Sequence, residues 1–281
     1  MTRPCRSALY IPAANARAME KARNLPADAI IFDLEDAVAP AEKPAARDLL
    51  AAALSGDYGR RLKILRINGL ATEWGAGDAA LAAQLEGRVD AVLLPKVGGP
   101  ADLDALAGLV EAPLWAMIET PAGVLNASAI AAHPRLQGLV MGTNDLAKEL
   151  GAHFRPDRLP MIAALGGCLL AARAAGRVIL DGVFNAFRDE QGLRAEAVQG
   201  RDMGFDGKTL IHPAQLAVTN EVFAPDAAEI DLARRQIAAF EAAEAEGRGV
   251  AVLDGRIVEN LHVASARRML ALAKAIEEAG F

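Results

Sequence analysis

The stretch Ala29-Ile-Ile-Phe-Asp33, continued by Leu34-Glu35-Asp36, is typical of a buried parallel strand that ends in acidic residues. The run is apolar until its last residue, as expected for a strand that is covered on both faces. A helical pattern of alanines and leucines follows at residues 44–54. We therefore interpret this stretch as one βα unit, and its recurrence along the chain decides the fold.

Comparable apolar runs recur along the chain, and the set comprises residues 7–11, 29–33, 62–67, 91–94, 114–118, 138–141, 178–180 and 207–211. Helical patterns such as residues 16–23, 78–85 and 102–109 lie between them. A doubly wound open sheet alternates strands and helices in the same way. Because the βα units number eight within the usual length of a barrel, they favour an α/β fold of the TIM (β/α)8 barrel type.

The pattern changes after the eighth unit, and we expect two domains, a barrel over residues 1–224 and an extension over residues 225–281. The extension begins with an amphipathic stretch at residues 227–246. Two apolar runs around Asp254-Gly255 predict a β-hairpin, and a last helix is expected at residues 263–279. Such a module is too small to build a core of its own, so we expect it to pack on the barrel or on a neighbouring subunit.

Composition excludes several classes of protein. The 281 residues carry 30 Lys and Arg against 36 Asp and Glu, a net charge of −6 that argues against a nucleic-acid partner. No apolar run is long enough to span a membrane. With 2 cysteines and 4 scattered histidines, neither a disulfide framework nor a zinc site is supported, and a cytoplasmic location is expected. Any metal ligands should therefore be carboxylates.

Polar residues follow most of the expected strands, and in a barrel these strand ends meet at one mouth. They include Glu35, Asp36, Arg66, Lys96, Glu119, Asn144 and Asp145. Carboxylates crowded into one cleft repel one another unless they are protonated or bridged by a cation, and Mg²⁺ accepts such oxygen ligands. We therefore expect Glu119 and Asp145 to bind a metal directly and Glu35 and Asp36 to hold it through water.

Each of these residues also has a simpler interpretation. Asp36 and Asn144 are residue types that commonly cap helices. Glu119 directly ends the apolar run Trp-Ala-Met-Ile, where a buried acid needs a partner or an ion. Arg66 could hold a carboxylate or a thioester oxygen, or form an ion pair with an acid of the mouth. Lys96 and Asn144 are further candidates for substrate binding, and the sequence contains no G-x-S-x-G motif of a serine esterase.

The chain resembles the citrate lyase beta-subunit-like CoA-ester lyases of the HpcH/HpaI aldolase superfamily. The segments that carry the resemblance are Arg6-Ser-Ala-Leu-Tyr-Ile-Pro-Ala13, Asp33-Leu-Glu-Asp-Ala-Val38, Arg66-Ile-Asn68, Leu94-Pro-Lys96, Ile118-Glu-Thr120, Gly142-Thr-Asn-Asp-Leu146 and Met203-Gly-Phe-Asp-Gly-Lys-Thr-Leu-Ile-His-Pro213. The resemblance implies a TIM barrel in trimers or dimers of trimers. It also implies Mg²⁺, with Mn²⁺ as a substitute, at Glu119 and Asp145, and an arginine at position 66 that steadies an enolate-like thioester oxygen.

One position departs from the lyases of that family. There, the C-terminal hairpin of one subunit brings an aspartate to its neighbour's active site, and here the place is taken by Glu259. The added methylene moves the carboxylate, and a misplacement of about 1 Å can cost roughly 100-fold in rate. The segments Val258-Glu-Asn-Leu-His262 and Val183-Phe-Asn-Ala-Phe-Arg-Asp189 look most like the branch that hydrolyses malyl-CoA.

The resemblance leaves three functions to compare. The first is Mg²⁺-dependent hydrolysis of (3S)-malyl-CoA, with Arg66 polarising the thioester and Glu259, Glu35 or Asp36 activating water. The second is reversible carbon–carbon cleavage of malyl-CoA or citramalyl-CoA. The third is a non-enzymatic role, in which the barrel has become a binding or assembly subunit, and the related citrate lyase beta subunit works inside such a complex. For the phosphates of coenzyme A, the candidates are Arg6, Lys21 and Arg23, for which solvated surface charge is the alternative.

Overall fold

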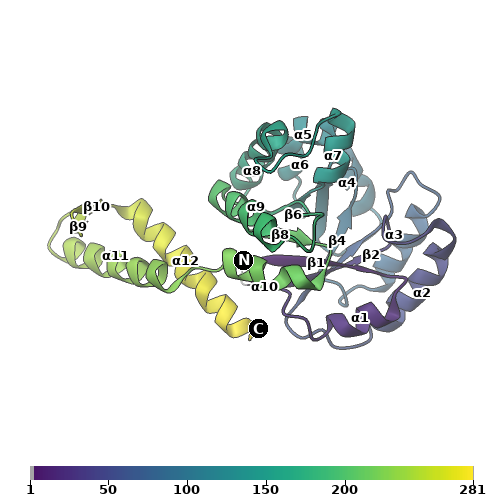
Figure 1. Ribbon diagram of the computed structural model, residues 1–281, viewed down its shortest axis with the longest axis horizontal. Helices are drawn as coiled ribbons and strands as arrows, with labels where there is room; N and C mark the ends of the chain where they lie inside the picture. The colour runs from purple at the N-terminus through teal and green to yellow at the C-terminus, as the bar shows by residue number, and fades with distance from the viewer. Residues whose placement is uncertain (1–2, 281) are drawn as a thin grey trace. The chain divides into compact units, whose positions relative to one another are not determined.

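Eight parallel strands pair in chain order and the last pairs with the first, which closes the sheet into a barrel (Figure 1). The computed structural model describes residues 3–280. The strands are β1 (Ser7–Pro12), β2 (Ala29–Asp33), β3 (Leu62–Arg66), β4 (Ala91–Leu94), β5 (Leu114–Ile118), β6 (Leu136–Met141), β7 (Val178–Asp181) and β8 (Gly207–Leu210). The predicted TIM barrel is thereby confirmed, and the open sheet is excluded.

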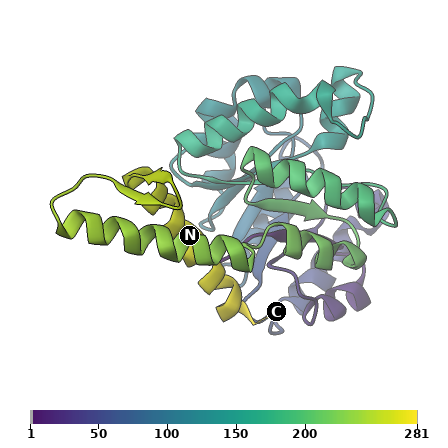
Figure 2. The same cartoon turned by 60° about the vertical axis from the view of Figure 1, so that its left-hand side comes forward.

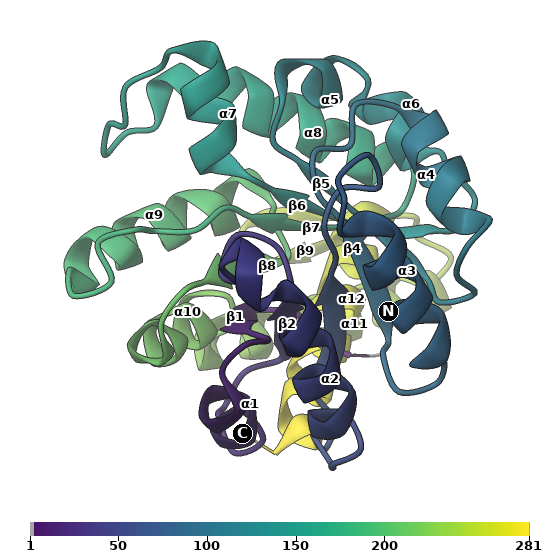
Figure 3. The ribbon, with the colours of Figure 1, turned by 90° about the vertical axis from the view of Figure 1, so that its right-hand side faces the viewer.

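Helices surround the strands on the outside of the barrel (Figure 3). They are α1 (Ala16–Ala22), α2 (Lys43–Ala53), α3 (Gly75–Gln84), α4 (Pro100–Ala107), α5 (Pro121–Leu125), α6 (Ala127–Ala131), α7 (Thr143–Leu150), α8 (Ile162–Ala174), α9 (Glu190–Met203) and α10 (Leu216–Val222). Thr143 and Asp145, which follow strand β6, form the first turn of α7. A carboxylate in the first turn of a helix is favourably placed in the field of the helix dipole.

The core has two layers because side chains alternate along each strand. One layer lies between the strands and the helices and includes Ile30 and Phe32. The other fills the barrel interior and includes Ile31, Ile64 and Met117. Continuing this alternation to the ends of the strands turns the next side chains inward, and these are Tyr10, Asp33, Arg66 and Glu119. The period-two pattern of the strands therefore delivers charged groups to the mouth of an otherwise apolar barrel.

The contacts of the chain separate a unit over Cys5–Phe223 from a second unit that contains the chain from Ala224 onward. The second unit consists of α11 (Ala227–Ala245), the hairpin β9 (Ala251–Leu253) and β10 (Arg256–Val258), and α12 (Asn260–Ala279). The hairpin lies alongside α11 (Figure 2) and shares with it a small core around Ala243, Ala251 and Val258. Asp254 and Gly255 both have positive φ, as a two-residue hairpin turn of the predicted kind requires. The helix–hairpin–helix prediction is thus confirmed.

The two cysteines, Cys5 and Cys168, are buried and free of disulfides. Burial raises the pKa of the Cys168 thiol to about 12 and that of Cys5 well above its usual value. Both thiols therefore stay protonated and serve as small apolar side chains. Within residues 3–280, no helix is both long and apolar enough to cross a membrane.

Candidate active site

An ion pair between neighbouring strands forms the centre of the mouth. Asp33 of β2 and Arg66 of β3 are partners in the register of the two strands. Nε of Arg66 donates to Oδ1 of Asp33 over 2.7 Å, and Nη2 donates to Oδ2 over 2.5 Å. The Asp33 carboxylate also accepts the backbone N–H groups of Glu35 and Ala37 at 2.8 and 3.1 Å. Asp33, to which the sequence assigned no role, therefore fixes both Arg66 and the loop that carries Glu35.

Arg66 meets two further carboxylates and an aromatic ring. Its Nη1 lies 2.8 Å from Oε2 of Glu35 and 3.5 Å from Oδ2 of Asp36. Its Cζ lies 4.9 Å from the centre of the Tyr10 ring. Burial by itself lowers the pKa of Arg66, but the charge of Asp33 and its hydrogen bonds raise it well above the ordinary value. The guanidinium is therefore a permanent cation, and its expected ion pairing with acids of the mouth is present.

Glu119 is buried immediately after β5 and is held on two sides. Its Oε1 accepts the backbone N–H of Lys96 over 2.8 Å. A methyl group at Gly142 would lie 2.6 Å from Oε2, so only glycine leaves room for this carboxylate. Burial raises the pKa of Glu119 to about 8, and the charge of Glu35 adds to the rise. A cation at Oε2 would offset the cost of burying the charged carboxylate. A buried acid of this kind is therefore suited to bind a metal ion.

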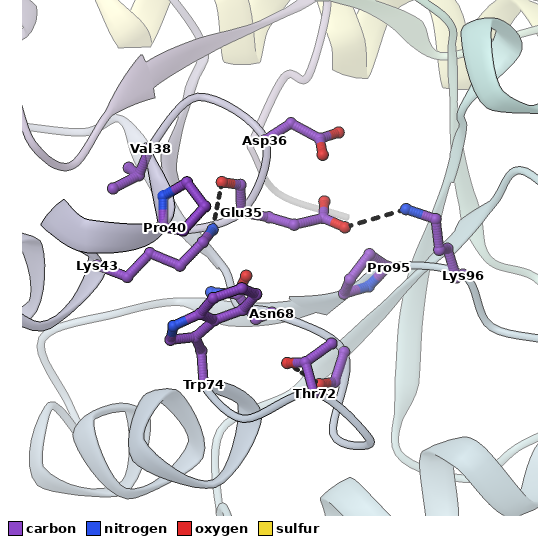
Figure 4. Close-up of a pocket in the computed structure, with 11 residues that line it drawn as sticks. Glu35, Asp36, Val38, Pro40, Lys43, Asn68, Thr72, Trp74, Pro95 and Lys96 are labelled. Carbon is purple, nitrogen blue, oxygen red and sulfur yellow. Dashed lines mark hydrogen bonds and ion pairs between the residues drawn. The ribbon is translucent and has the colours of Figure 1, made fainter.

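Lys96 connects two of the acids. It adopts a left-handed backbone with φ of 52°, which aims its N–H at Glu119. Its Nζ lies 3.4 Å from Oε1 of Glu35, and the two side chains point toward each other in Figure 4. Burial by itself lowers the pKa of Lys96, but Glu35, Glu119 and Asp145 raise it above the ordinary value. Lys96 is thus a cation beside the acids, with its side chain about half exposed.

A cavity of about 330 Å³ opens beside Glu35, Asp36 and Lys96 (Figure 4). Its far wall contains Lys43, whose Nζ donates to the backbone oxygens of Leu34 and Glu35 over 2.8 and 2.6 Å. No role was predicted for this lysine, although it appears just before the helical stretch that follows the acids. Its signal was weak because a lysine at the start of a helix looks like ordinary surface charge. Its contacts show that it fastens the acidic loop to α2.

The acids can hold a hard cation. The charges of Glu35 and Asp145 both act on the pKa of Glu119, so these carboxylates share one electrostatic field. Oε1 of Glu119 accepts the N–H of Lys96, Oε2 makes no hydrogen bond within residues 3–280, and Asp145 is half-buried. In the described residues no group of three or more His, Cys, Asp and Glu side chains is assembled as a metal site. Two carboxylates completed by waters and substrate oxygens are the donor set that suits Mg²⁺.

The remaining predicted residues lie in different surroundings. The amide of Asn144 exchanges hydrogen bonds with Asn185 at 3.2 and 2.8 Å, which ties α7 to the loop after β7. Glu259 is exposed at the start of α12 in the second unit, and its backbone N–H donates to Nδ1 of His262. Its predicted role at a neighbour's site remains a prediction.

The assignment of Arg6 to coenzyme A is wrong. Arg6 precedes β1, at the end of the barrel opposite the mouth, and is 4% exposed. Its guanidinium donates to both oxygens of Asp28 at 2.9 and 2.8 Å, so it is unavailable to a phosphate. Arg23 is likewise engaged, by Glu20 at 2.8 Å and by the ring of Tyr58. Lys21 is exposed on the last turn of α1, and its role stays a prediction.

The fold and the mouth define an acid-lined (β/α)8 barrel with a fixed arginine and a place for a divalent cation. The chain belongs to the HpcH/HpaI aldolase/citrate lyase family, whose model matches residues 6–213. This confirms the resemblance found in the sequence.

Three similar proteins illustrate the range of the family. The chain is 66% identical over 275 residues to a (3S)-malyl-CoA thioesterase of Cereibacter sphaeroides (strain KD131 / KCTC 12085), covering 97% of this chain and 96% of the relative. It is 37% identical over 287 residues to the citrate lyase subunit beta of Escherichia coli (strain K12), covering 97% and 94%. The crystal structure of CitE from Mycobacterium tuberculosis in complex with magnesium, acetoacetate and coenzyme A superposes with a TM-score of 0.82 at 33% identity, covering 98% of this chain and 100% of that chain.

Proposed function

We propose that this protein is a Mg²⁺-dependent enzyme that hydrolyses (3S)-malyl-CoA to malate and coenzyme A. The observation that carries the proposal is the 66% identity to a (3S)-malyl-CoA thioesterase across 97% of the chain. The mouth alone is compatible with both hydrolysis and carbon–carbon cleavage, because both reactions place negative charge on the same thioester oxygen. The alternative is therefore a reversible CoA-ester lyase or a citrate lyase beta subunit.

Glu119 and Asp145 would hold the Mg²⁺, with Glu35 and Asp36 contacting it through water and Mn²⁺ as a substitute. The ion would supply Lewis acidity and a template for the carboxylate and hydroxyl of the malyl group. Oε2 of Glu119, for which Gly142 leaves the space, makes no hydrogen bond within residues 3–280 and supports this assignment. The site therefore fits the magnesium that the CitE crystal contains.

The side chains around this ion would divide the work of hydrolysis. Arg66, held by Asp33, would bind the thioester carbonyl oxygen, and Lys96 and Asn144 would contact the malyl group. Glu35, which Arg66 and Lys96 hold in place from two sides, would orient or deprotonate the attacking water. Burial raises the pKa of Glu35 above its ordinary value, which makes its carboxylate a better proton acceptor.

The affinity for Mg²⁺ should rise with pH and level off above about 8. The pKa of Glu119 is raised to about 8, so below this pH the metal must displace a proton from its ligand. The slope in the logarithm of the dissociation constant should approach one unit per pH unit. Calorimetric titration of the metal-free protein at several pH values measures it, and an affinity independent of pH between 6 and 8 would contradict the Glu119 assignment.

We further propose a homotrimer, or a dimer of trimers, that works in the cytoplasm. The outer face of the hairpin supports an interface, because the cross-strand partners Val252 and Ile257 are 67% and 61% exposed. Glu259 follows this hairpin directly. We propose that the face docks on a second copy and that Glu259 approaches the neighbour's mouth. The free, buried cysteines are compatible with a reducing compartment.

The change Glu259→Asp should shift the products from hydrolysis towards cleavage. Aspartate at position 259 restores the acid that the lyases carry. We propose that the longer glutamate places its carboxylate where it can activate water instead. The measurement is the ratio of malate to glyoxylate formed from malyl-CoA, with Glu246→Asp as a control at another exposed acid of the same unit. An unchanged ratio of malate to glyoxylate would contradict the proposal that Glu259 selects the reaction.

Identification of the products tests the function itself. Purified protein is incubated with (3S)-malyl-CoA and Mg²⁺, and the products are separated by chromatography. Free coenzyme A with malate supports hydrolysis. Acetyl-CoA with glyoxylate, or with pyruvate from citramalyl-CoA, would contradict the proposal and establish the lyase. Activity of the isolated protein on free CoA thioesters would exclude dependence on a citrate lyase complex.

A further inference from the structure

Tyr10 is an aromatic residue of the mouth to which no role has yet been assigned. It lies on β1, two residues after the inward-facing Ala8, so its side chain also faces the barrel interior. Its ring lies 4.9 Å from Cζ of Arg66 and packs against the interior layer. The charges of Arg66, Asp33, Glu119 and Glu35 all act on its hydroxyl. Tyr10 therefore belongs to the same site as the arginine and the acids.

The hydroxyl of Tyr10 makes no hydrogen bond to another group in residues 3–280, and its side chain is partly exposed. By contrast, the hydroxyl of Tyr58, the other tyrosine, donates to the backbone oxygen of Met19 over 3.2 Å. The hydroxyl of Tyr10 is therefore free to donate to a molecule bound in the mouth.

Arg66 by itself has few donors left for a substrate. A guanidinium carries five N–H groups. Nε and Nη2 each give one to Asp33, and Nη1 gives one to Sδ of Met117 over 3.9 Å while lying 2.8 Å and 3.5 Å from carboxylate oxygens of Glu35 and Asp36. An oxygen that develops negative charge beside Arg66 would thus be met by a cation that already uses three of its five N–H groups within the protein. A second, uncommitted donor at the same place would complete the site.

Burial raises the pKa of Tyr10 far above its usual value, and Asp33, Glu119 and Glu35 add to the rise while Arg66 opposes it. The phenol therefore remains protonated through the physiological range and can only donate a hydrogen bond to an anion. A neutral donor also suits this place electrostatically. It adds no charge to a mouth in which Arg66 already faces three carboxylates.

We propose that the Tyr10 hydroxyl is a catalytic hydrogen-bond donor to the thioester carbonyl oxygen, completing with Arg66 a two-donor cradle for the oxyanion. This inference rests on the proposed function. In hydrolysis, the water oxygen bonds to the carbonyl carbon, its proton passes to a carboxylate of the mouth, and the carbonyl π pair moves onto oxygen. When the C=O bond re-forms, the C–S bond breaks and the sulfur leaves with that proton as free thiol. Tyr10 transfers no proton and stabilises the intermediate charge.

The change Tyr10→Phe tests the hydroxyl alone, because the phenylalanine ring keeps the packing against Arg66. We expect kcat for malyl-CoA hydrolysis to fall by about 100-fold, as after loss of one oxyanion donor, with KM changed less than about 3-fold. Mg²⁺ affinity and the melting temperature should stay unchanged. Tyr58→Phe, which removes a phenol away from the mouth, is the matched control and should retain wild-type kcat.

The outcomes separate the inference from the proposed function. Wild-type kcat in Tyr10→Phe would overturn the inference and leave the thioesterase standing. Equal losses of kcat and Mg²⁺ affinity would also overturn it, because they would indicate a disturbed site rather than a missing donor. If the wild-type protein cleaves malyl-CoA instead of hydrolysing it, the proposed function fails. The inference is then tested on cleavage, whose enolate charge develops on the same oxygen.

Discussion

The change Glu119→Gln is expected to abolish Mg²⁺-dependent turnover, with a loss on the order of 1,000-fold in kcat. Glutamine has the same shape and can still accept the N–H of Lys96 over the observed 2.8 Å. It lacks the negative charge that a hard cation requires, so the metal site loses its buried ligand. Turnover of malyl-CoA and calorimetric Mg²⁺ titration measure the two effects.

The same change should not destabilise the metal-free protein. Burial raises the pKa of Glu119 to about 8, so the folded protein carries an unfavourable charge there above this pH. A neutral amide removes that charge, and the melting temperature at pH 9 without metal should be equal to or above that of the wild type. Glu111→Gln, at an exposed acid outside the mouth, is the control. Full Mg²⁺-dependent turnover in Glu119→Gln would show that the ligand is another residue.

The change Arg66→Lys should lower kcat by about 100-fold or more although the positive charge is kept. An ammonium cannot make the two parallel hydrogen bonds to Asp33, and it loses the contact of the guanidinium with the Tyr10 ring. Without these two hydrogen bonds, Asp33 is held less firmly, and so is the loop whose backbone N–H groups it accepts. We expect a loss of about 1–3 kcal/mol in the free energy of unfolding, measured with urea.

A double-mutant cycle of Asp33→Asn with Arg66→Lys tests whether Asp33 affects turnover by positioning Arg66. Asp33 is directed at Arg66 and at the backbone of its own loop, so its effect on turnover should pass through the arginine. The double variant should therefore be little worse than Arg66→Lys alone. Losses that simply add would show that the two residues act independently and would contradict the positioning role of Asp33.

The sequence predicts those features that depend on local pattern. The apolar runs at 29–33, 91–94 and 114–118 coincide with strands β2, β4 and β5, because buried parallel strands leave a continuous apolar signature. The convergence of Glu35, Arg66 and Lys96 follows from the topology of a parallel barrel, in which all strands end at one mouth. The contacts among these three residues bear out that expectation.

Features that depend on a distant partner could not be predicted. Arg6 looks like a free cation in the sequence, but its partner Asp28 lies 22 residues away and buries it. The roles of Asp33 and Tyr10 emerge only when the register of β1, β2 and β3 brings them beside Arg66. Gly142 is similar, since its importance comes from the side chain of Glu119, which follows β5. Such contacts are decided by tertiary packing, which a local pattern does not encode.

The register between β2 and β3 gives the Asp33–Arg66 pair a second consequence. A slip of one residue would turn either side chain from the interior to the helix-facing layer, where a lone buried charge is costly. The pair therefore helps to specify the register of the two strands during folding, because only one pairing places both charges next to each other. A related protein without the catalytic activity would therefore still need this arginine, because the same two residues fix the register of β2 and β3.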